Sequence, residues 1–196
     1  MAPSESGVTP EALSELLAKQ AITEVVFRYA RAIDRLDETL LRSVFHPGSR
    51  HNHFYEGPSS DPEAPTSAES PGDFVAFALG LLASFSRTHH QLGNTLIEFA
   101  DNENARVESY FTAFHRMRPR GDPLAAENAY DTEMDYFVGG RYIDRFALRN
   151  GEWKIIERVG MTDWTRVEPP ASQGFGDIDP RTVGHRAPDD FICQSD

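Results

Sequence analysis

The sequence predicts an α+β fold, in which helices come first and a run of antiparallel strands follows. In residues 9–45 and 72–85 the apolar side chains recur with the spacing of an α-helix, and after residue 88 they alternate with a period of two. Four alternating segments are separated by turns and loops, of which Asn150-Gly151 is a strong hairpin signal. This order of elements favours α+β over an alternating α/β arrangement.

Three helices are expected in the first half of the chain. Thr9 caps the first helix and Pro10 suits its first turn, while Asp37 begins a short second helix over residues 38–45. The third helix covers residues 72–85. The apolar stripe of the first helix consists of Leu13, Leu16, Leu17, Ile22, Val25, Val26, Tyr29 and Ile33.

A short strand over residues 51–55 precedes a proline-rich loop over residues 57–71. The long strands are expected at residues 88–99, 105–117, 135–148 and 153–164. The elements form one domain over residues 9–168, between a disordered N-terminus at residues 1–8 and an extended tail at residues 169–196. We expect the tail to wrap around the domain or around a neighbouring subunit.

Composition excludes several classes of partner. The formal net charge of −12 disfavours nucleic acid and anionic membranes. The single cysteine, Cys193, allows neither an internal disulfide nor a multi-thiolate metal site. No secretory signal and no run of 18 apolar residues is present, so we expect a cytoplasmic protein.

Three residues in two short motifs make the most specific chemical proposal. Tyr29 and Asp34 lie near the end of the first helix, and His90 follows Thr88-His89 on the first long strand. A phenol, a carboxylate and an imidazole can together move protons without a metal ion or a cofactor, so neither is expected. The chain also lacks a glycine-rich phosphate motif.

Only one of the adjacent residues His89 and His90 can point into the interior, because neighbouring residues of a strand face opposite sides. His90 shares its expected face with Leu92 and Leu96, whereas His89 shares its face with polar residues. The apolar residues that share this face with His90 predict that His90 points into the interior.

Asp34 follows Tyr29 by five residues, which is about 140° around an ideal helix. Both can reach one pocket only if the helix bends near Ile33 or the pocket wraps around the end of the helix. Asp34 could otherwise be a solvated acid, and Asp37 is better placed to cap the second helix.

The other candidates also have structural interpretations. Tyr29 could be a core tyrosine, and Arg141 could be a surface charge paired with Asp144. His51 and His53 have a spacing that suits a metal ion, but no further ligand accompanies them, and we expect no metal site.

Four segments resemble motifs of a known superfamily. They are RYARAIDRLD at residues 28–37, THHQLGN at residues 88–94, GRYIDRF at residues 140–146 and NGEWKI at residues 150–155. They are similar to the SnoaL-like dehydratase branch of the nuclear-transport-factor-2-like (NTF2-like) superfamily, whose members act on scytalone and bile acids. The resemblance covers residues 10–168.

The resemblance implies a cone-shaped, strongly curved antiparallel sheet that packs on the N-terminal helices and encloses a pocket, the NTF2-like or cystatin-like fold. It implies a homodimer or homotrimer. It also implies that Tyr29, Asp34 and His90 are the catalytic residues, and that Arg141 contacts substrate.

Further contacts with substrate are expected from Phe54, Phe77 and Tyr110. Some relatives carry a second polar residue, His or Asp, on the strand that follows the catalytic histidine. The matching segment, residues 108–111, supplies no equivalent.

The function expected from the residues and the resemblance is a cofactor-independent lyase acting on a bulky aromatic or polycyclic alcohol. The reaction is either dehydration or a retro-aldol cleavage that releases a small aldehyde. The alternatives are an isomerase, a non-catalytic small-molecule-binding protein, or a scaffold like the small subunit of aromatic-ring dioxygenases.

Overall fold

The computed structural model describes residues 9–53, 71–171, 179 and 182–193. Phe54 and most of the expected 57–71 loop lie outside the described residues. The helices and strands are α1 (Pro10–Arg35), α2 (Glu38–Ser43), β1 (Phe45–His53), α3 (Pro71–Ala83), β2 (Phe85–Phe99), β3 (Asn104–Met117), β4 (Met134–Arg149) and β5 (Glu152–Glu168), followed by a 3-10 turn at Phe191–Cys193.

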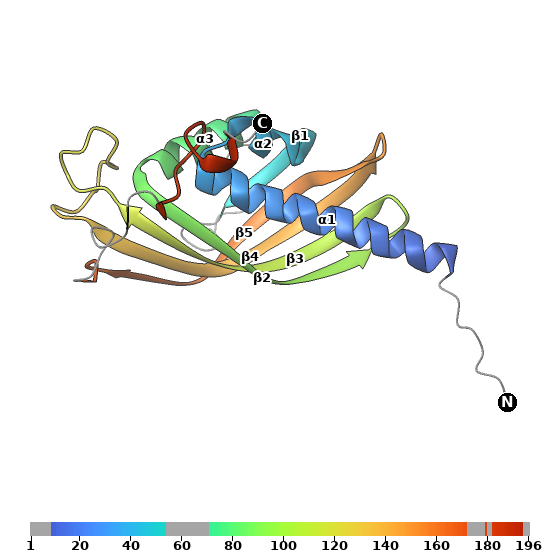
Figure 1. Cartoon of the computed structure of the whole chain (residues 1–196). Helices are drawn as coiled ribbons and strands as arrows, with labels where there is room; N and C mark the ends of the chain where they lie inside the picture. The colour runs from blue at the N-terminus through green and yellow to red at the C-terminus, as the bar shows by residue number, and fades with distance from the viewer. Residues whose placement is uncertain (1–8, 54–70, 172–178, 180–181, 194–196) are drawn as a thin grey trace.

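The five strands form one curved, open sheet in the order β1-β5-β4-β3-β2, and the helices lie on its concave side (Figure 1). The α+β, cystatin-like architecture is therefore confirmed. The expectation of a wholly antiparallel sheet is wrong at one edge, because β1 pairs parallel with β5. Tight turns fix β2–β3 and β4–β5 as antiparallel, but no turn joins β1 to β5, so nothing local fixes the direction of β1.

Helix α1 begins where the sequence predicts. The Thr9 hydroxyl accepts a hydrogen bond from the backbone N–H of Ala12 at 3.2 Å. The helix ends at Arg35 and is capped by Leu36, whose φ of 54° is left-handed. Its apolar stripe is buried only from Ile22 onward, while the three leucines before it are half-exposed or more. The first turns of α1 extend past the sheet (Figure 1), which explains why that part of the stripe is not core.

The Asn150-Gly151 turn forms as predicted. Both residues have positive φ, 53° and 79°, as the two-residue hairpin turn requires. Asp37 caps α2, because its carboxylate accepts the backbone N–H of Leu40 at 2.9 Å. This capping role is the one expected for Asp37.

A bulge in β2 changes which residues face inward. The register with β3 shifts between Leu92 and Thr95. An extra residue in one strand reverses the alternation beyond it. Leu96 is therefore 58% exposed, and the expectation that it shares the inner face with His90 is wrong. His90 lies before the bulge and keeps its expected face.

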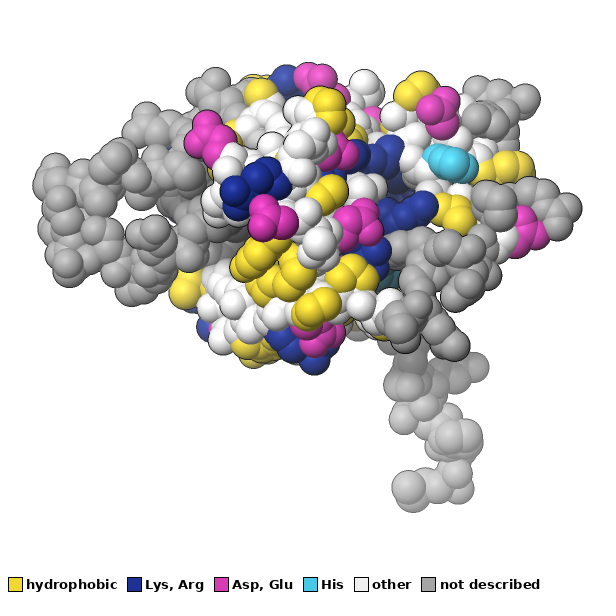
Figure 2. Space-filling view, turned by 90° about the vertical axis from the view of Figure 1, so that its left-hand side faces the viewer, with side chains coloured by type: hydrophobic (Ala, Val, Ile, Leu, Met, Phe, Trp, Pro, Cys, Tyr) yellow, Lys and Arg dark blue, Asp and Glu magenta, His cyan; other side chains and the backbone are white. Residues whose placement is uncertain are grey.

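The described part of the C-terminal tail, residues 182–193, returns to the C-terminal end of α1 (Figure 1). The backbone N–H of Ala187 donates to the carbonyl of Arg35 at 2.9 Å. Figure 2 looks at the end of the molecule where β2 begins, and Lys and Arg side chains gather there in a hollow of the surface. The tail therefore packs on its own domain in this region.

Candidate active site

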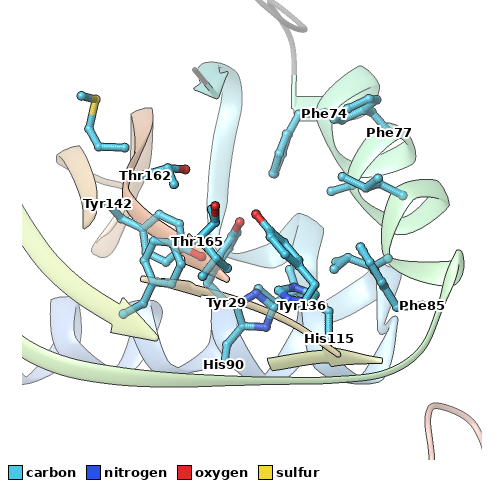
Figure 3. A pocket seen from close by; sticks show the side chains of 17 residues that line it. Tyr29, Phe74, Phe77, Phe85, His90, His115, Tyr136, Tyr142, Thr162 and Thr165 are labelled. Atoms are coloured by element: carbon cyan, nitrogen blue, oxygen red, sulfur yellow. The ribbon is translucent and has the colours of Figure 1, made fainter. Parts of the chain in front are cut away.

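A cavity of about 320 Å³ lies between α1, α3 and the concave face of the sheet. Helix α3 closes one side with Phe74, Phe77 and Leu81. Figure 3 shows the polar side chains around the same space. They come from α1 and from four strands, and they are Tyr29, His90, His115, Tyr136, Tyr142, Thr162 and Thr165.

Asp34 and His90 form a directly hydrogen-bonded pair. One carboxylate oxygen of Asp34 accepts from ring Nδ1 of His90 at 2.7 Å, and the other accepts from the backbone N–H of His90 at 2.8 Å. The side chain of His90 is 7% exposed and that of Asp34 is 16% exposed. Because Nδ1 donates to Asp34, the neutral ring carries its proton on Nδ1 and keeps a lone pair on Nε2. The pair therefore offers a base to the cavity that His90 lines.

The charge state of Asp34 supports this assignment. Burial raises the pKa of the Asp34 carboxyl, but the hydrogen bonds and the positive charge of His90 outweigh burial and lower the pKa below its ordinary value. Asp34 is therefore ionised at neutral pH. An ionised Asp34 stabilises the imidazolium that forms when His90 accepts a proton.

Asp34 reaches His90 without entering the main cavity. Tyr29 lines the main cavity, whereas Asp34 lines a second, more polar cavity of about 540 Å³. The α-helix continues to Arg35. Tyr29 and Asp34 need not reach one cavity, because Asp34 bonds to the ring of His90 while Tyr29 lines the main cavity directly.

His115 on β3 is a pocket residue that sequence reasoning missed. Its ring lies edge-on to that of His90, with 5.2 Å between the centroids. Burial, with a contribution from the nearby His90, lowers the pKa of His115 to about 3, so His115 is neutral at neutral pH. The second polar residue was sought only at residues 108–111, whereas His115 lies further along the same strand. The alternation of β3 could have identified His115, because it places this residue on the same face as Phe111 and Ala113.

Beneath the cavity lies a fully buried ion pair. Arg158 donates to both carboxylate oxygens of Asp144, at 2.7 and 2.6 Å, and both side chains are 0% exposed. The same guanidinium lies 3.9 Å from the ring centroid of Tyr29 and 4.3 Å from that of Tyr142. Burial opposes the charge of Arg158, but Asp144 outweighs it and raises the pKa of the guanidinium. Asp144 was one possible partner of Arg141 in the sequence, and that alternative is wrong, because Asp144 pairs with Arg158.

The phenols that line the cavity are neutral. Burial raises the pKa of Tyr29, against the opposing effect of Arg158. Burial also raises the pKa of Tyr142 and of the half-buried Tyr136. Neutral phenols donate hydrogen bonds and do not accept protons at neutral pH, so they complement the base on His90.

The other described residues that were expected to contact substrate lie on different sides of the sheet. Phe77 lines the cavity. Tyr110 does not, and it is 43% exposed on the outer face, where the guanidinium of Arg141 lies 5.9 Å from its ring centroid. Arg141 pairs there with Asp163 and Glu108, each at 3.1 Å. The geometry therefore separates Tyr110 and Arg141 from the cavity.

Metal ligands do not gather among the described residues, where no group of three or more His, Cys, Asp or Glu side chains could hold an ion. His51 instead stacks on Phe74, with 3.3 Å between the ring centroids. Within the described part of the chain, none of the helices is both long and apolar enough to cross a membrane.

A family model described as a SnoaL-like domain matches residues 14–159, which is most of the described domain. No curated protein matches the sequence significantly.

Several solved structures share the fold. A hexachlorocyclohexane dehydrochlorinase, LinA type 2, superposes with a TM-score of 0.67 at 15% identity, over 85% of this chain and 99% of that chain. A protein from Novosphingobium aromaticivorans that carries the provisional name scytalone dehydratase gives a TM-score of 0.61 at 20% identity, over 82% and 97% of the two chains. LinA type 3 from Novosphingobium barchaimii gives 0.64 at 15% identity, over 86% and 99%. At these identities the likeness shows a common fold.

Proposed function

This chain belongs to the family of SnoaL-like domain proteins, and we propose that it is a cofactor-independent lyase that eliminates water from a small, uncharged, aromatic alcohol. The observation that carries the proposal is the bond between Asp34 and Nδ1 of His90, which leaves Nε2 available as a base at the wall of an aromatic cavity.

In the proposed reaction, Nε2 of His90 takes a proton from the carbon next to the one that carries the hydroxyl group. The electrons of that C–H bond form the carbon–carbon double bond, and the C–O bond breaks. The hydroxide that departs takes up the proton from the imidazolium and leaves as water, so His90 returns to its neutral form. Asp34 stabilises the imidazolium in between, and it stays ionised throughout.

The phenols stabilise the oxygen that gains negative charge. Tyr29 and Tyr136 line the cavity with hydroxyl groups whose pKa values are raised by burial, so each donates a hydrogen bond without losing its proton. Donors fixed in a cavity that excludes water stabilise developing charge more strongly than water does. Arg158 lies against the ring of Tyr29 and favours its role as a donor.

The wall of the cavity indicates the class of substrate. Its aromatic side chains fit a flat, apolar ring system, and among the described residues that line it none is Lys, Arg, Asp or Glu. A charged substrate would lose its hydration without gaining an ionic partner. The fold neighbours include a dehydrochlorinase, in which chloride rather than hydroxide is the leaving group; the same base would serve either leaving group.

The proposal can be tested with a β-hydroxy ketone fused to a benzene ring, since loss of water gives a product with extended conjugation that absorbs light at longer wavelength. We expect wild-type protein to form this product and the His90→Ala variant to do so about 10²–10⁴-fold more slowly. His89→Ala is the matched control, because His89 is the exposed neighbour on the opposite face of the strand.

Equal rates for wild-type protein and His90→Ala would contradict the role of His90 as the base. A product of unchanged mass would instead favour an isomerase, in which the same base removes a proton from carbon. Release of an aldehyde would favour carbon–carbon cleavage, in which the base removes the proton of the hydroxyl group and the carbon–carbon bond breaks.

A further inference from the structure

The two residues of the Asp34–His90 pair lie on different elements, and the C-terminal segment links those elements. Asp34 belongs to the last turn of α1, while His90 belongs to β2. Segment 184–190 bonds to both elements and to α3, which forms a wall of the cavity. The pair is thus held between elements that the tail connects.

Arg186 makes the central contacts of this segment. Its Nη1 donates to the carbonyl of Phe85 at the start of β2 at 3.0 Å, and its Nη2 donates to the carbonyl of Leu82 in α3 at 3.1 Å. One planar guanidinium therefore joins β2 to α3, next to the point where both enter the cavity wall through Phe85 and Leu82.

The residues next to Arg186 attach the segment to α1. The backbone N–H of Ala187 donates to the carbonyl of Arg35 at 2.9 Å, and Nε of Arg35 lies 3.3 Å from the carboxylate of Asp190. Arg35 directly follows Asp34, so these bonds fix the end of the helix from which Asp34 projects. On the other side, Arg87 of β2 donates to the carbonyl of Gly184 at 3.4 Å.

Arg186 is one of the cations that line the second, polar cavity, which Asp34 also lines. Among the described residues no carboxylate forms an ion pair with Arg186, which lies with Asp34 around the second, polar cavity (Figure 2 shows basic side chains gathered at this end). Burial and the nearby Arg118 and Arg87 lower the pKa of Arg186, while Asp34 opposes them. Among the described residues, Asp34 bonds to His90, and its charge acts on His115 and Tyr142. The other charged or titratable groups that line the cavity with Asp34 are Arg35, Arg87, His89, His185, Arg186 and Asp190.

We propose that Arg186 is a positioning residue for the Asp34–His90 pair. It joins β2 to the C-terminal end of α1 through the tail, and it supplies a positive charge to the polar cavity that Asp34 also lines. The hydrogen-bonding role is independent of the reaction. The consequence for catalysis rests on the proposed function, since it requires His90 to act as a base.

The positional role is tested without any substrate, by NMR measurement of how fast the His90 Nδ1–H and backbone N–H exchange with solvent at neutral pH. Both groups donate to Asp34, so their exchange reports the geometry of the pair. We expect Arg186→Gln to accelerate both exchanges by about tenfold, because it weakens a local unit rather than the whole fold. Arg145→Gln is the matched control, since Arg145 is an exposed arginine whose partner is Glu157.

The charge role is tested by the pH profile of kcat/KM. Loss of a cation beside the pair makes its protonation easier, so we expect the acid limb of Arg186→Gln to move to higher pH by about half a unit. Arg186→Lys keeps the charge but cannot bond both carbonyls in the same way. It should leave the acid limb in place while still accelerating exchange, and it remains informative if Arg186→Gln does not fold.

Unchanged exchange in both Arg186 variants, or equal acceleration in Arg145→Gln, would overturn the positional role. An acid limb that moves as far in Arg186→Lys as in Arg186→Gln would overturn the charge role. If no turnover is found for wild-type protein, the exchange measurement still decides the positional role, so failure of the proposed function is distinguishable from failure of this inference.

Discussion

Two pairs of a carboxylate and a basic side chain, Asp144–Arg158 and Asp34–His90, differ in which of their atoms remain available for a reaction. In the Asp144–Arg158 pair, both carboxylate oxygens bond to one guanidinium and both side chains are completely buried. In the Asp34–His90 pair, the carboxylate binds one edge of the imidazole and the other edge faces a cavity. The first pair is closed, and the second is open at one nitrogen.

The difference separates a structural role from a chemical one. Arg158 has no state in which it releases a proton, because Asp144 raises its pKa further above the ordinary value for arginine. His90 can accept a proton on Nε2 while Asp34 compensates the new charge. Buried carboxylates are therefore not equivalent, and the partner decides whether a pair supports the fold or takes part in a reaction.

The largest effect is expected when the Asp144–Arg158 pair is broken. Asp144→Ala leaves the guanidinium of Arg158 buried without its partner, so we expect the free energy of unfolding to fall by about 3–5 kcal/mol. Urea denaturation of the variant measures this loss. The double variant Asp144→Leu/Arg158→Met should recover much of it, because removing both charges leaves no unpaired ion. A loss below about 1 kcal/mol in the single variant would show that the pair is not structural.

A change in the open pair should act on the reaction instead. We expect Asp34→Asn to lower kcat/KM by about 10²-fold, because an amide cannot compensate the charge of an imidazolium, with a loss of about 1 kcal/mol in stability. Asp37→Asn is the control and should change little, since Asn also caps helices. The comparison fails if Asp37 proves to be the residue that activity needs, or if Asp34→Asn only destabilises the fold.

A smaller effect concerns acid stability near the open pair. The pKa of His115 is lowered from 6.5 to about 3 in the folded protein, so the unfolded chain binds more protons between these values. The free energy of unfolding therefore falls as pH falls below 6.5, by at most about 1.4 kcal/mol per pH unit from this residue. The contribution of Asp34 is separate, because its lowered pKa makes its stabilisation disappear only below 3.8.

His115→Phe should remove the first of these declines, so that between about pH 6.5 and pH 4 the stability of the variant depends less on pH than that of wild-type protein. Urea denaturation at several pH values measures both slopes. Parallel slopes would mean that His115 is not held neutral by the fold.

The fold and the two residues of the Asp34–His90 pair could be predicted from the sequence, because they depend on local patterns and short motifs. Helix caps, the Asn150-Gly151 turn and the alternation around His90 are all read from neighbouring residues. Tyr29, Asp34 and His90 were expected from short motifs. In the structure Tyr29 and His90 line the main cavity, and Asp34 bonds to His90 from a second cavity.

Two of the errors come from registers between strands, which local patterns do not fix. The shift in β2 after Leu92 exposes Leu96. A second shift, between Arg145 and Phe146, aligns Asp144 with Arg158, whereas an unbroken hairpin would have placed Asp144 opposite Glu157. One inserted residue therefore decides whether Asp144 and Arg158 pair in the core, and no sequence motif indicates the position of this insertion.

The central claim, that Asp34 leaves Nε2 of His90 free as a base, is tested most directly by long-range ¹H–¹⁵N NMR of the His90 ring in the resting protein. The account predicts that the neutral ring carries its proton on Nδ1 in wild-type protein, and that this preference weakens in Asp34→Asn. A neutral ring protonated on Nε2 in wild-type protein, or an unchanged preference for Nδ1 in Asp34→Asn, would contradict it.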